Sequence, residues 1–198
     1  MTSTPAAVEE LLTAIGKCAV CSASLPAGPR PIVQFSETSR LVIVGQAPGS
    51  KVHASGVPWD DASGDRLREW TSLPKSDFYD PARVALVPIG FCYPGAGDGG
   101  DLPPRPECAP LWHPQILQVL PAERLTLLVG VFAQARYLPS AKRQSMTEAV
   151  RGSGAASRSS VISLPHPSWR SGIWMQRNPW FETEVLPKLR AAVAEAMG

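Results

Sequence analysis

The chain has 198 residues, of which 44% are hydrophobic and 18% are charged. A chain of this length can bury one good core, so we expect a single domain over residues 1–198. The sequence has no run of about 18 or more apolar residues, and its start lacks the basic and apolar regions of a signal peptide. These features argue against a membrane-spanning or secreted class. They predict a soluble, cytoplasmic protein, which we expect to be a monomer with no membrane partner.

The net charge of +2 comes from 19 basic and 17 acidic residues and does not by itself indicate a nucleic-acid partner. The charge is unevenly distributed, however. Residues 136–177 carry seven Lys and Arg against the single acid Glu148, so the rest of the chain is net negative. A one-sided basic field suits a polyanion such as DNA, because Lys and Arg displace counterions from phosphate. An ordinary solvated basic face is the alternative.

The predicted elements begin with an amphipathic helix that Thr4 and Pro5 open and Gly16 ends. Short apolar runs rich in branched residues, each bounded by Gly or Pro, predict buried strands at 41–45, 82–89, 124–130 and 159–165. Helices are predicted at 63–73, 105–120, 131–138, 140–150 and 178–197. Ser63 and Asn178 are the expected caps, and Pro187 is expected to kink or divide the last helix.

Strands that alternate with helices favour an α/β fold with three layers, α/β/α, around a central, mostly parallel four-stranded sheet. Gly- and Pro-rich segments at 94–106 and 152–160 are predicted to be surface loops. They are expected to lie within the single domain, because the composition does not change on either side of them. We find no internal repeat. The fold class therefore predicts functional residues at the carboxyl ends of the strands.

The four cysteines fall in two pairs. Cys18 and Cys21 form a C-x2-C pair after the first helix, and Cys92 and Cys108 form a more widely spaced pair. An even count without a secretory signal favours a metal site over disulfides. Four thiolates can hold a tetrahedral zinc or a cubane iron–sulfur cluster, and the open second pair is unlike the two tight knuckles of a zinc ribbon. Four unrelated buried cysteines are the alternative.

Two candidate functional loops directly follow predicted strands. Residues 45–49 form a Gly- and Pro-rich turn after the first strand, and His166 follows the last one. Open α/β sheets bind ligands at the carboxyl ends of their strands, so we expect these loops to meet there. The sequence lacks the signatures of P-loop NTPases, α/β-hydrolases and zincins.

These motifs resemble those of the uracil-DNA glycosylase superfamily. The first active-site motif of that superfamily is similar to GQAPGSKVHASGVPWDDASGD at 45–65, and its second, the HPS loop, is similar to LPHPSWR at 164–170. The segment FCYPGAGDGGDLPPRPECAPLW at 91–112 resembles the cluster-binding stretch of the bacterial and archaeal iron–sulfur branches, the family 4 and family 5 type. The ordered set runs from Cys18 to about Arg170.

The resemblance implies a monofunctional DNA glycosylase. Such an enzyme flips uracil or a related deaminated base out of single- or double-stranded DNA and hydrolyses its bond to deoxyribose. The resemblance also implies a structural 4Fe-4S cluster, with zinc as the alternative, held by Cys18, Cys21, Cys92 and Cys108.

The resemblance assigns roles within both motifs. His166 matches the histidine that stabilises the departing base, and Trp59 matches an aromatic stacking position, with a core aromatic as the alternative. The residues expected at the base are Gly45, Ala47, Trp59 and Ser168. The residues expected at the DNA are Trp169, Arg170 and Arg177, with Trp169 as a candidate wedge. His113, in the helix after the cysteines, is predicted to be structural.

The chain departs from the family pattern at two places. Many members carry Asp, Glu or Asn in or just after the first turn to position the attacking water, whereas this chain has Gln46 and no carboxylate before Asp60. Gln46 can orient a water but cannot take its proton; His53 can do both, or it is an exposed loop histidine. The iron–sulfur branch also usually has a base-reading asparagine where this chain has the apolar residues 87–91, so backbone groups are expected to read the base.

Three functions are compatible with these features. The first is an active glycosylase for uracil or a related deaminated base. The second is a DNA-binding or lesion-sensing module of the same fold with weak or no excision, suggested by the missing carboxylate and asparagine. The third is a zinc-bound α/β protein with no nucleic-acid role.

Overall fold

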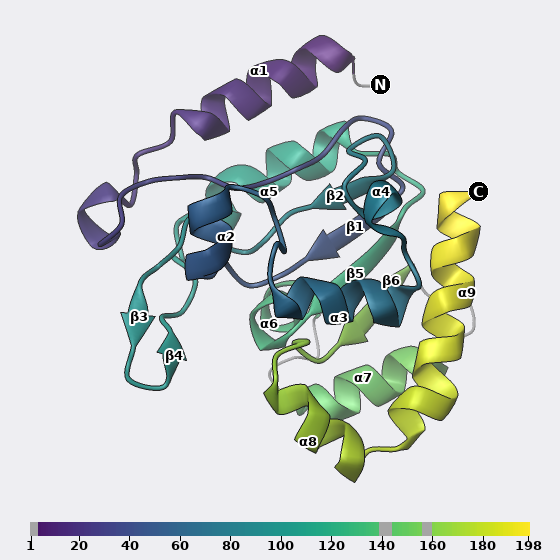
Figure 1. Ribbon diagram of the computed structural model, residues 1–198. Helices are drawn as coiled ribbons and strands as arrows, with labels where there is room; N and C mark the ends of the chain where they lie inside the picture. The colour runs from purple at the N-terminus through teal and green to yellow at the C-terminus, as the bar shows by residue number, and fades with distance from the viewer. Residues whose placement is uncertain (1–3, 139–143, 156–159) are drawn as a thin grey trace.

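The computed structural model describes residues 4–138, 144–155 and 160–198. Its centre is a four-stranded sheet in the order β2-β1-β5-β6 (Figure 1). All three strand pairings are parallel. The predicted strands and their parallel arrangement are therefore confirmed. The strands are β1 (Leu41–Val44), β2 (Val84–Leu86), β5 (Leu125–Val129) and β6 (Val161–Leu164).

The sheet is buried on both faces. Along β1, Leu41 and Ile43 belong to one hydrophobic cluster, whereas Val42 and Val44 belong to a second one. Successive side chains of a strand point to opposite faces, so a sheet covered on both sides requires unbroken apolar strands. This is the pattern from which the strands were predicted.

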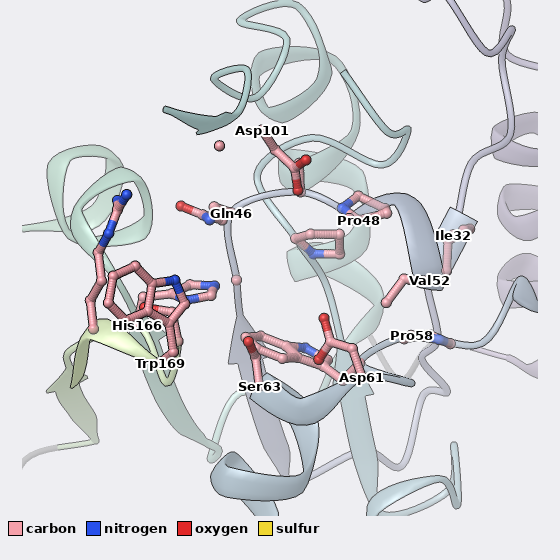
Figure 2. Close-up of a pocket in the computed structure, with 18 of the residues that line it drawn as sticks. Ile32, Gln46, Pro48, Val52, Pro58, Asp61, Ser63, Asp101, His166 and Trp169 are labelled. Atoms are coloured by element: carbon pink, nitrogen blue, oxygen red, sulfur yellow. The ribbon is translucent and has the colours of Figure 1, made fainter. Parts of the chain in front are cut away.

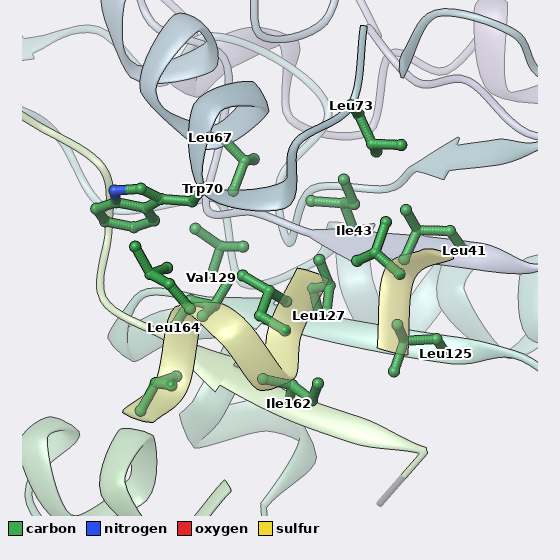
Figure 3. Packing of buried hydrophobic residues seen from close by; sticks show 14 of the residues in the cluster. Leu41, Ile43, Leu67, Trp70, Leu73, Leu125, Leu127, Val129, Ile162 and Leu164 are labelled. Atoms are coloured by element: carbon green, nitrogen blue, oxygen red, sulfur yellow. The ribbon is translucent and has the colours of Figure 1, made fainter. Parts of the chain in front are cut away.

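Helices form the two outer layers, which confirms the predicted α/β/α architecture (Figure 1). One face is covered by α3 (Ala62–Thr71), α7 (Met146–Ala155) and α9 (Leu186–Met197). Figure 3 shows Leu67 and Trp70 of α3 packed over the strand residues Ile43, Leu127 and Val129. The other face is covered by α5 (Cys108–Val119) and α6 (Val131–Tyr137), and α1 (Pro5–Gly16) packs on α5.

Several short elements were not predicted. The predicted loop at 94–106 contains a hairpin whose strands are only two residues long and lack apolar alternation. Helix α8 follows the HPS loop without a side-chain cap. These unpredicted elements are α2 (Ser50–Ser55), α4 (Lys75–Phe78), α8 (Arg170–Arg177) and the hairpin β3 (Ala96–Gly97) to β4 (Gly100–Asp101).

Two predicted helix caps are wrong. The Asp61 carboxylate accepts a hydrogen bond from the Gly64 N–H at 2.8 Å, so Asp61 rather than Ser63 caps α3. Asn178 ends α8 instead of opening the last helix, because its side-chain amide donates to the Trp174 carbonyl at 2.9 Å. In both cases the side-chain hydrogen bond decides which helix end the residue caps.

The other helix boundaries follow from proline positions. Helix α5 begins at Cys108 rather than at 105, because Pro106 disfavours a helical conformation in the residue before it. Pro187 lies in the first turn of α9, after a π-helical turn at Phe181–Val185, so the predicted division is confirmed. The predicted helix at 140–150 starts partly outside the described residues, and α7 extends into the predicted loop at 152–160. No described helix has the length and apolar character needed to cross a membrane.

Candidate active site

The two strand-end loops meet at the carboxyl edge of the sheet and line one pocket of about 530 Å³ (Figure 2). One loop follows β1, the other follows β6, and the β3–β4 hairpin contributes a third wall. The structure brings most of the predicted site residues together here, while their roles stay predictions. Those that line the pocket are Gly45, Gln46, Ala47, Trp59, His166, Ser168, Trp169 and Arg170.

The Trp59 ring lies against Gly45 at the end of β1. A Cβ atom at Gly45 would be only 2.7 Å from Cζ2 of Trp59, so a glycine is needed to make room for the ring. Trp59 has a φ of 57°, which is uncommon for a bulky residue, and a Cβ at Gly64 would lie 1.8 Å from its carbonyl oxygen. The half-buried ring packs on the core and also lines the pocket, so it has features of both alternatives considered for it.

His166 lies beside the Trp59 ring, with the ring centroids 5.9 Å apart and the planes 28° from parallel. Burial lowers the pKa of His166, and the nearby Asp61 carboxylate opposes this effect. A histidine with a lowered pKa is neutral near pH 7 and still has one N–H to donate. His166 can therefore act as a neutral hydrogen-bond donor in the pocket.

The start of the HPS loop is held by two hydrogen bonds. The Leu164 carbonyl at the end of β6 accepts from the Gly130 N–H and from the buried Gln134 side-chain amide, both at 2.9 Å. Gly130 has a φ of 86° and lies close to His166, since a Cβ there would be 3.4 Å from the His166 Cβ. Gln134 was not identified from the sequence, where a glutamine in a helix carries no special signal.

Arg66 holds the rest of the HPS loop. Its guanidinium, on α3, donates to the Pro167 carbonyl at 3.3 Å, to the Ser168 carbonyl and to the Ser171 hydroxyl at 3.1 Å. One terminal nitrogen of Arg66 thus contacts three acceptors within residues 167–171. Arg66 also was not identified from the sequence, although it directly follows the first motif.

Two carboxylates line the pocket that were not assigned to it: Asp61, before α3, and Asp101, in β4. Figure 2 shows them on different walls, with Asp61 near Ser63 and Asp101 near Pro48. Asp61 is the second of two adjacent acids within the first motif, which is a weak sequence signal. Nothing in the sequence places Asp101 at this edge, because the hairpin reaches it only in the folded chain.

His53 is the predicted catalytic residue that does not line the pocket. It lies half-buried on α2, with its ring 5.8 Å from the ring of Tyr93. Its Nδ1 is buried and has no hydrogen-bond partner among the described residues. The structure therefore does not bring His53 together with Gln46 and His166.

The pocket wall at residues 88–90 has no unpaired N–H group. Pro88, which lines the pocket, has none, the Ile89 N–H donates to the Gly45 carbonyl at 2.9 Å, and the Gly90 N–H donates to the Gln46 carbonyl at 2.8 Å. The Pro88 carbonyl accepts from Nε2 of His113 at 2.9 Å. The N–H groups of this wall are therefore not free to read the base, while the expectation that backbone groups read it stays a prediction. The structural position predicted for His113 agrees with its burial.

At the mouth of the pocket, Trp169 is 70% exposed. The Arg170 guanidinium lies 5.2 Å from the centroid of the Trp169 ring and donates to the Gly99 carbonyl of the hairpin at 3.1 Å. Arg177 lies at the far end of α8 and does not line the pocket. Trp169 and Arg170 are thus exposed where a bound polymer would meet the pocket.

The described basic residues of 136–177 do not form one patch. Arg136 is on α6, in one helical layer, and Arg151 is on α7, in the other, where it packs over Trp180. Arg170 and Arg177 are on α8. Among the described basic residues of this stretch, only Arg170 lies at the pocket mouth, and Arg177 lies further along α8. Lys142, Arg143 and Arg158 lie outside the described residues.

All four cysteines line a second, small cavity beside α5, which we call the cysteine cavity. Burial raises the pKa of the Cys92 thiol and raises that of Cys108 to about 11. Burial and the Glu107 carboxylate also raise the pKa of Cys21, and the Arg105 guanidinium opposes this rise. Buried thiols of this kind need a nearby cation to ionise.

The polar groups around the cysteine cavity fit an anionic, sulfur-rich group. Arg105 and Trp112 line the cavity, and Nε of Arg105 and Nε1 of Trp112 are buried without a hydrogen-bond partner among the described residues. Sulfur ligands would give both N–H groups an acceptor. In the described ranges, no three His, Cys, Asp or Glu side chains converge closely enough to hold a single metal ion.

The fold and the pocket together define an α/β/α protein with a ligand site at the carboxyl ends of parallel strands. The sequence model of the uracil DNA glycosylase superfamily matches residues 32–190, most of the chain, including both strand-end loops. The chain belongs to the uracil DNA glycosylase superfamily, whose members are DNA glycosylases. The matched range contains Cys92 and Cys108, while Cys18 and Cys21 precede it.

Proposed function

We propose that this protein is a monofunctional DNA glycosylase that hydrolyses the bond between deoxyribose and uracil, or a related deaminated base. The observation that carries the proposal is the pocket in which Trp59, His166 and both strand-end loops meet. A volume of about 530 Å³ is in the range of small-molecule sites and suits a flipped nucleotide.

The pocket offers the flipped base a flat surface and a polar edge. The Trp59 ring supplies the flat surface for stacking. The N–H groups of the wall at 88–90 are paired internally, and the Gln46 side chain is a neutral amide of the pocket with both a donor and an acceptor. Such an amide complements the imide edge of uracil, so Gln46 contributes to base recognition as well as to orienting water.

His166 stabilises the leaving base. As the bond to the sugar breaks, negative charge develops on the base carbonyl oxygen. The N–H of a neutral, half-buried histidine stabilises this charge strongly, because little water competes for the oxygen. Arg66 and Gln134 hold the loop so that His166 is in place before the substrate binds.

The carboxylates Asp61 and Asp101 supply the negative charge that the turn after β1 lacks. Positive charge develops on the sugar as the base departs, and a nearby carboxylate stabilises it and orients the attacking water. Asp61 is the better placed for the sugar, since it is close enough to His166 to affect its pKa. His53 has no part in this step.

DNA binds across the pocket mouth. The exposed Trp169 enters the space that the flipped base leaves, and Arg170 and Arg177 of α8 contact the backbone phosphates. Arg170 is held to the hairpin by its bond to Gly99, so the DNA contact and the pocket wall are linked.

The four cysteines hold a 4Fe-4S cluster. Four thiols share one cavity, and two N–H donors without a partner among the described residues line it. The open spacing of Cys92 and Cys108 is unlike the tight knuckles of a zinc ribbon, so these features favour the cluster. When bound, the cluster crosslinks the segment after α1 to α5. We assign it no redox step in base excision.

Excision is tested on single- and double-stranded oligonucleotides that contain uracil, hypoxanthine or xanthine, with anaerobically purified protein and alkaline cleavage of abasic sites. We expect abasic product from at least one base and none from unmodified DNA. No product at stoichiometric protein would overturn the enzyme proposal; salt-dependent binding to the same oligonucleotides would then support a lesion-sensing module. Iron, sulfide and a broad visible absorbance, lost in Cys92→Ala, test the cofactor separately.

A further inference from the structure

The cysteine cavity has two N–H donors without partners. Nε1 of Trp112 and Nε of Arg105 are both buried, and neither finds an acceptor among the described residues. Both residues line the cavity that the four cysteines share. A buried donor without an acceptor is costly, so a pair at one cavity indicates that something else accepts these hydrogen bonds.

The local geometry holds both donors at the cavity. Trp112 lies four residues after Cys108 on α5, so the two side chains share one face of the helix. The terminal nitrogen of Arg105 donates to the Glu107 carboxylate at 2.8 Å, which fixes the guanidinium while its Nε stays unpaired. Trp112 is only 9% exposed, so water is a poor substitute for a fixed acceptor.

We infer that the N–H groups of Arg105 and Trp112 donate hydrogen bonds to the sulfur atoms of the group that the four cysteines hold. This inference rests on the proposed 4Fe-4S cluster. Sulfides and thiolates accept hydrogen bonds from N–H groups, and the four thiolates make the whole group anionic. Arg105 and Trp112 therefore serve as hydrogen-bond donors to this group, and these two residues set the reduction potential of the cluster.

The positive charge of Arg105 also offsets the negative charge of Glu107 beside Cys21. The Cys21 sulfur lies 3.6 Å from the second carboxylate oxygen of Glu107. An unpaired carboxylate there would disfavour negative charge on the thiolate, and the ion pair with Arg105 offsets it. The pair of Arg105 and Glu107 thus brings one hydrogen-bond donor to the cavity at almost no net charge.

The sharpest test is Trp112→Phe, which keeps the aromatic ring and removes one N–H. Trp174→Phe is the matched control, because its indole N–H donates to the Thr147 hydroxyl at 3.0 Å, away from the cavity. The one-electron midpoint potential of each anaerobically purified protein is measured by film voltammetry, with iron and sulfide content. Hydrogen bonds to sulfur favour the more negative, reduced form, so Trp112→Phe should shift the potential to more negative values while Trp174→Phe should not.

Arg105 is tested without a change in net charge. Wild type, in which Arg105 and Glu107 form an ion pair, is compared with the double variant Arg105→Gln/Glu107→Gln, in which both groups are neutral, and the double variant should have the more negative potential. The potential of the double variant also tests the inference if Trp112→Phe fails to retain iron. Iron-replete variants with unchanged potentials would overturn this inference alone. Colourless, iron-free wild-type protein would instead overturn the proposed cofactor, and the inference with it.

Discussion

The pocket and the cysteine cavity are both assembled from distant parts of the chain, but they differ in how their polar groups are satisfied. The pocket loops are held by bonds within the protein, from Arg66 and Gln134 to loop carbonyls. In the described chain, four buried side-chain polar atoms lack a partner; two of them line the cysteine cavity and none lines the pocket. The pocket is thus preorganised without a ligand, whereas the cavity is completed by what it binds.

This difference predicts different consequences of substitution. A change in the cysteine cavity should lower the free energy of unfolding, because the bound group is part of the fold there. A change in the pocket should lower excision per folded molecule, because its loops keep their own hydrogen bonds. Measuring stability and single-turnover excision for each variant separates the two.

The largest effect is expected for Cys108→Ala. Loss of one ligand should release the cluster and lower the free energy of unfolding by about 4 kcal/mol or more, with loss of visible absorbance. Denaturant unfolding under anaerobic conditions measures this. Without a bound group, the change removes only one buried sulfur atom and should cost about 1 kcal/mol. A small loss with unchanged absorbance would contradict the proposed ligand.

The next effect is expected for His166→Ala. Removing the donor to the leaving base should slow single-turnover excision by about 10²–10³-fold, as for other preorganised donors at a developing anion. The midpoint of thermal unfolding should change little, because the Leu164 carbonyl stays bound to Gly130 and Gln134. Near-native turnover of the variant would remove His166 from the mechanism.

His113 connects the two regions, since it lies on α5 beside Trp112 and binds the Pro88 carbonyl of the pocket wall. Burial lowers its pKa from 6.5 to about 4, helped by Arg136, and its other nitrogen contacts the Tyr137 hydroxyl. Below pH 6.5 the unfolded chain binds this proton and the folded protein does not. The stability that neutral His113 contributes is therefore fully present above pH 6.5 and is lost as the pH drops towards 4.

We expect His113 to account for a loss of about 2 kcal/mol in the free energy of unfolding between pH 7 and pH 5. His113→Gln should be less stable at pH 7 but should lose less on acidification. Urea unfolding at the two pH values measures the difference. His166→Ala serves as the control for the other histidine with a lowered pKa. An equal pH dependence in His113→Gln and wild type would show that His113 is not the group responsible.

A smaller effect on excision is expected for Gly45→Ala. The added Cβ would lie 2.7 Å from the Trp59 ring, so the ring must move away from the end of β1. We expect about a tenfold loss of excision, about 1.4 kcal/mol, with most of it in substrate binding. Gly152→Ala is the control, because its Cβ would meet open space on α7. Equal excision by both variants would mean that Trp59 is not a stacking surface.

The sheet and the meeting of the two motifs could be predicted because both depend on local patterns. Each strand is a short apolar run buried on both faces, and the motifs directly follow β1 and β6. Asp101 and helix α8 could not be predicted. The β3–β4 hairpin has no apolar alternation to reveal it, and α8 begins without a capping side chain.

His53 shows the opposite case, a residue inside a motif that does not line the pocket. It follows the first turn closely in sequence, but α2 turns its ring towards Tyr93 instead. The period of a short helix, which the sequence did not reveal, decides which of its side chains line the pocket: Val52 does and His53 does not. Nearness in sequence is thus a poor guide to nearness in the site.

The smallest effect tests Arg66, a residue that only the structure identifies. Arg66→Lys keeps the positive charge but cannot donate to the carbonyls of Pro167 and Ser168 and to the Ser171 hydroxyl in the same fixed geometry. We expect a threefold to tenfold loss of excision, roughly 1 kcal/mol, because the HPS loop loses part of its support. Arg190→Lys is the matched control, since Arg190 also binds backbone carbonyls, those of Glu69 and Trp70, but away from the pocket. If both variants excise equally well, the loop is held by the Leu164 contacts alone, and the preorganisation of the pocket comes from β6 rather than from α3.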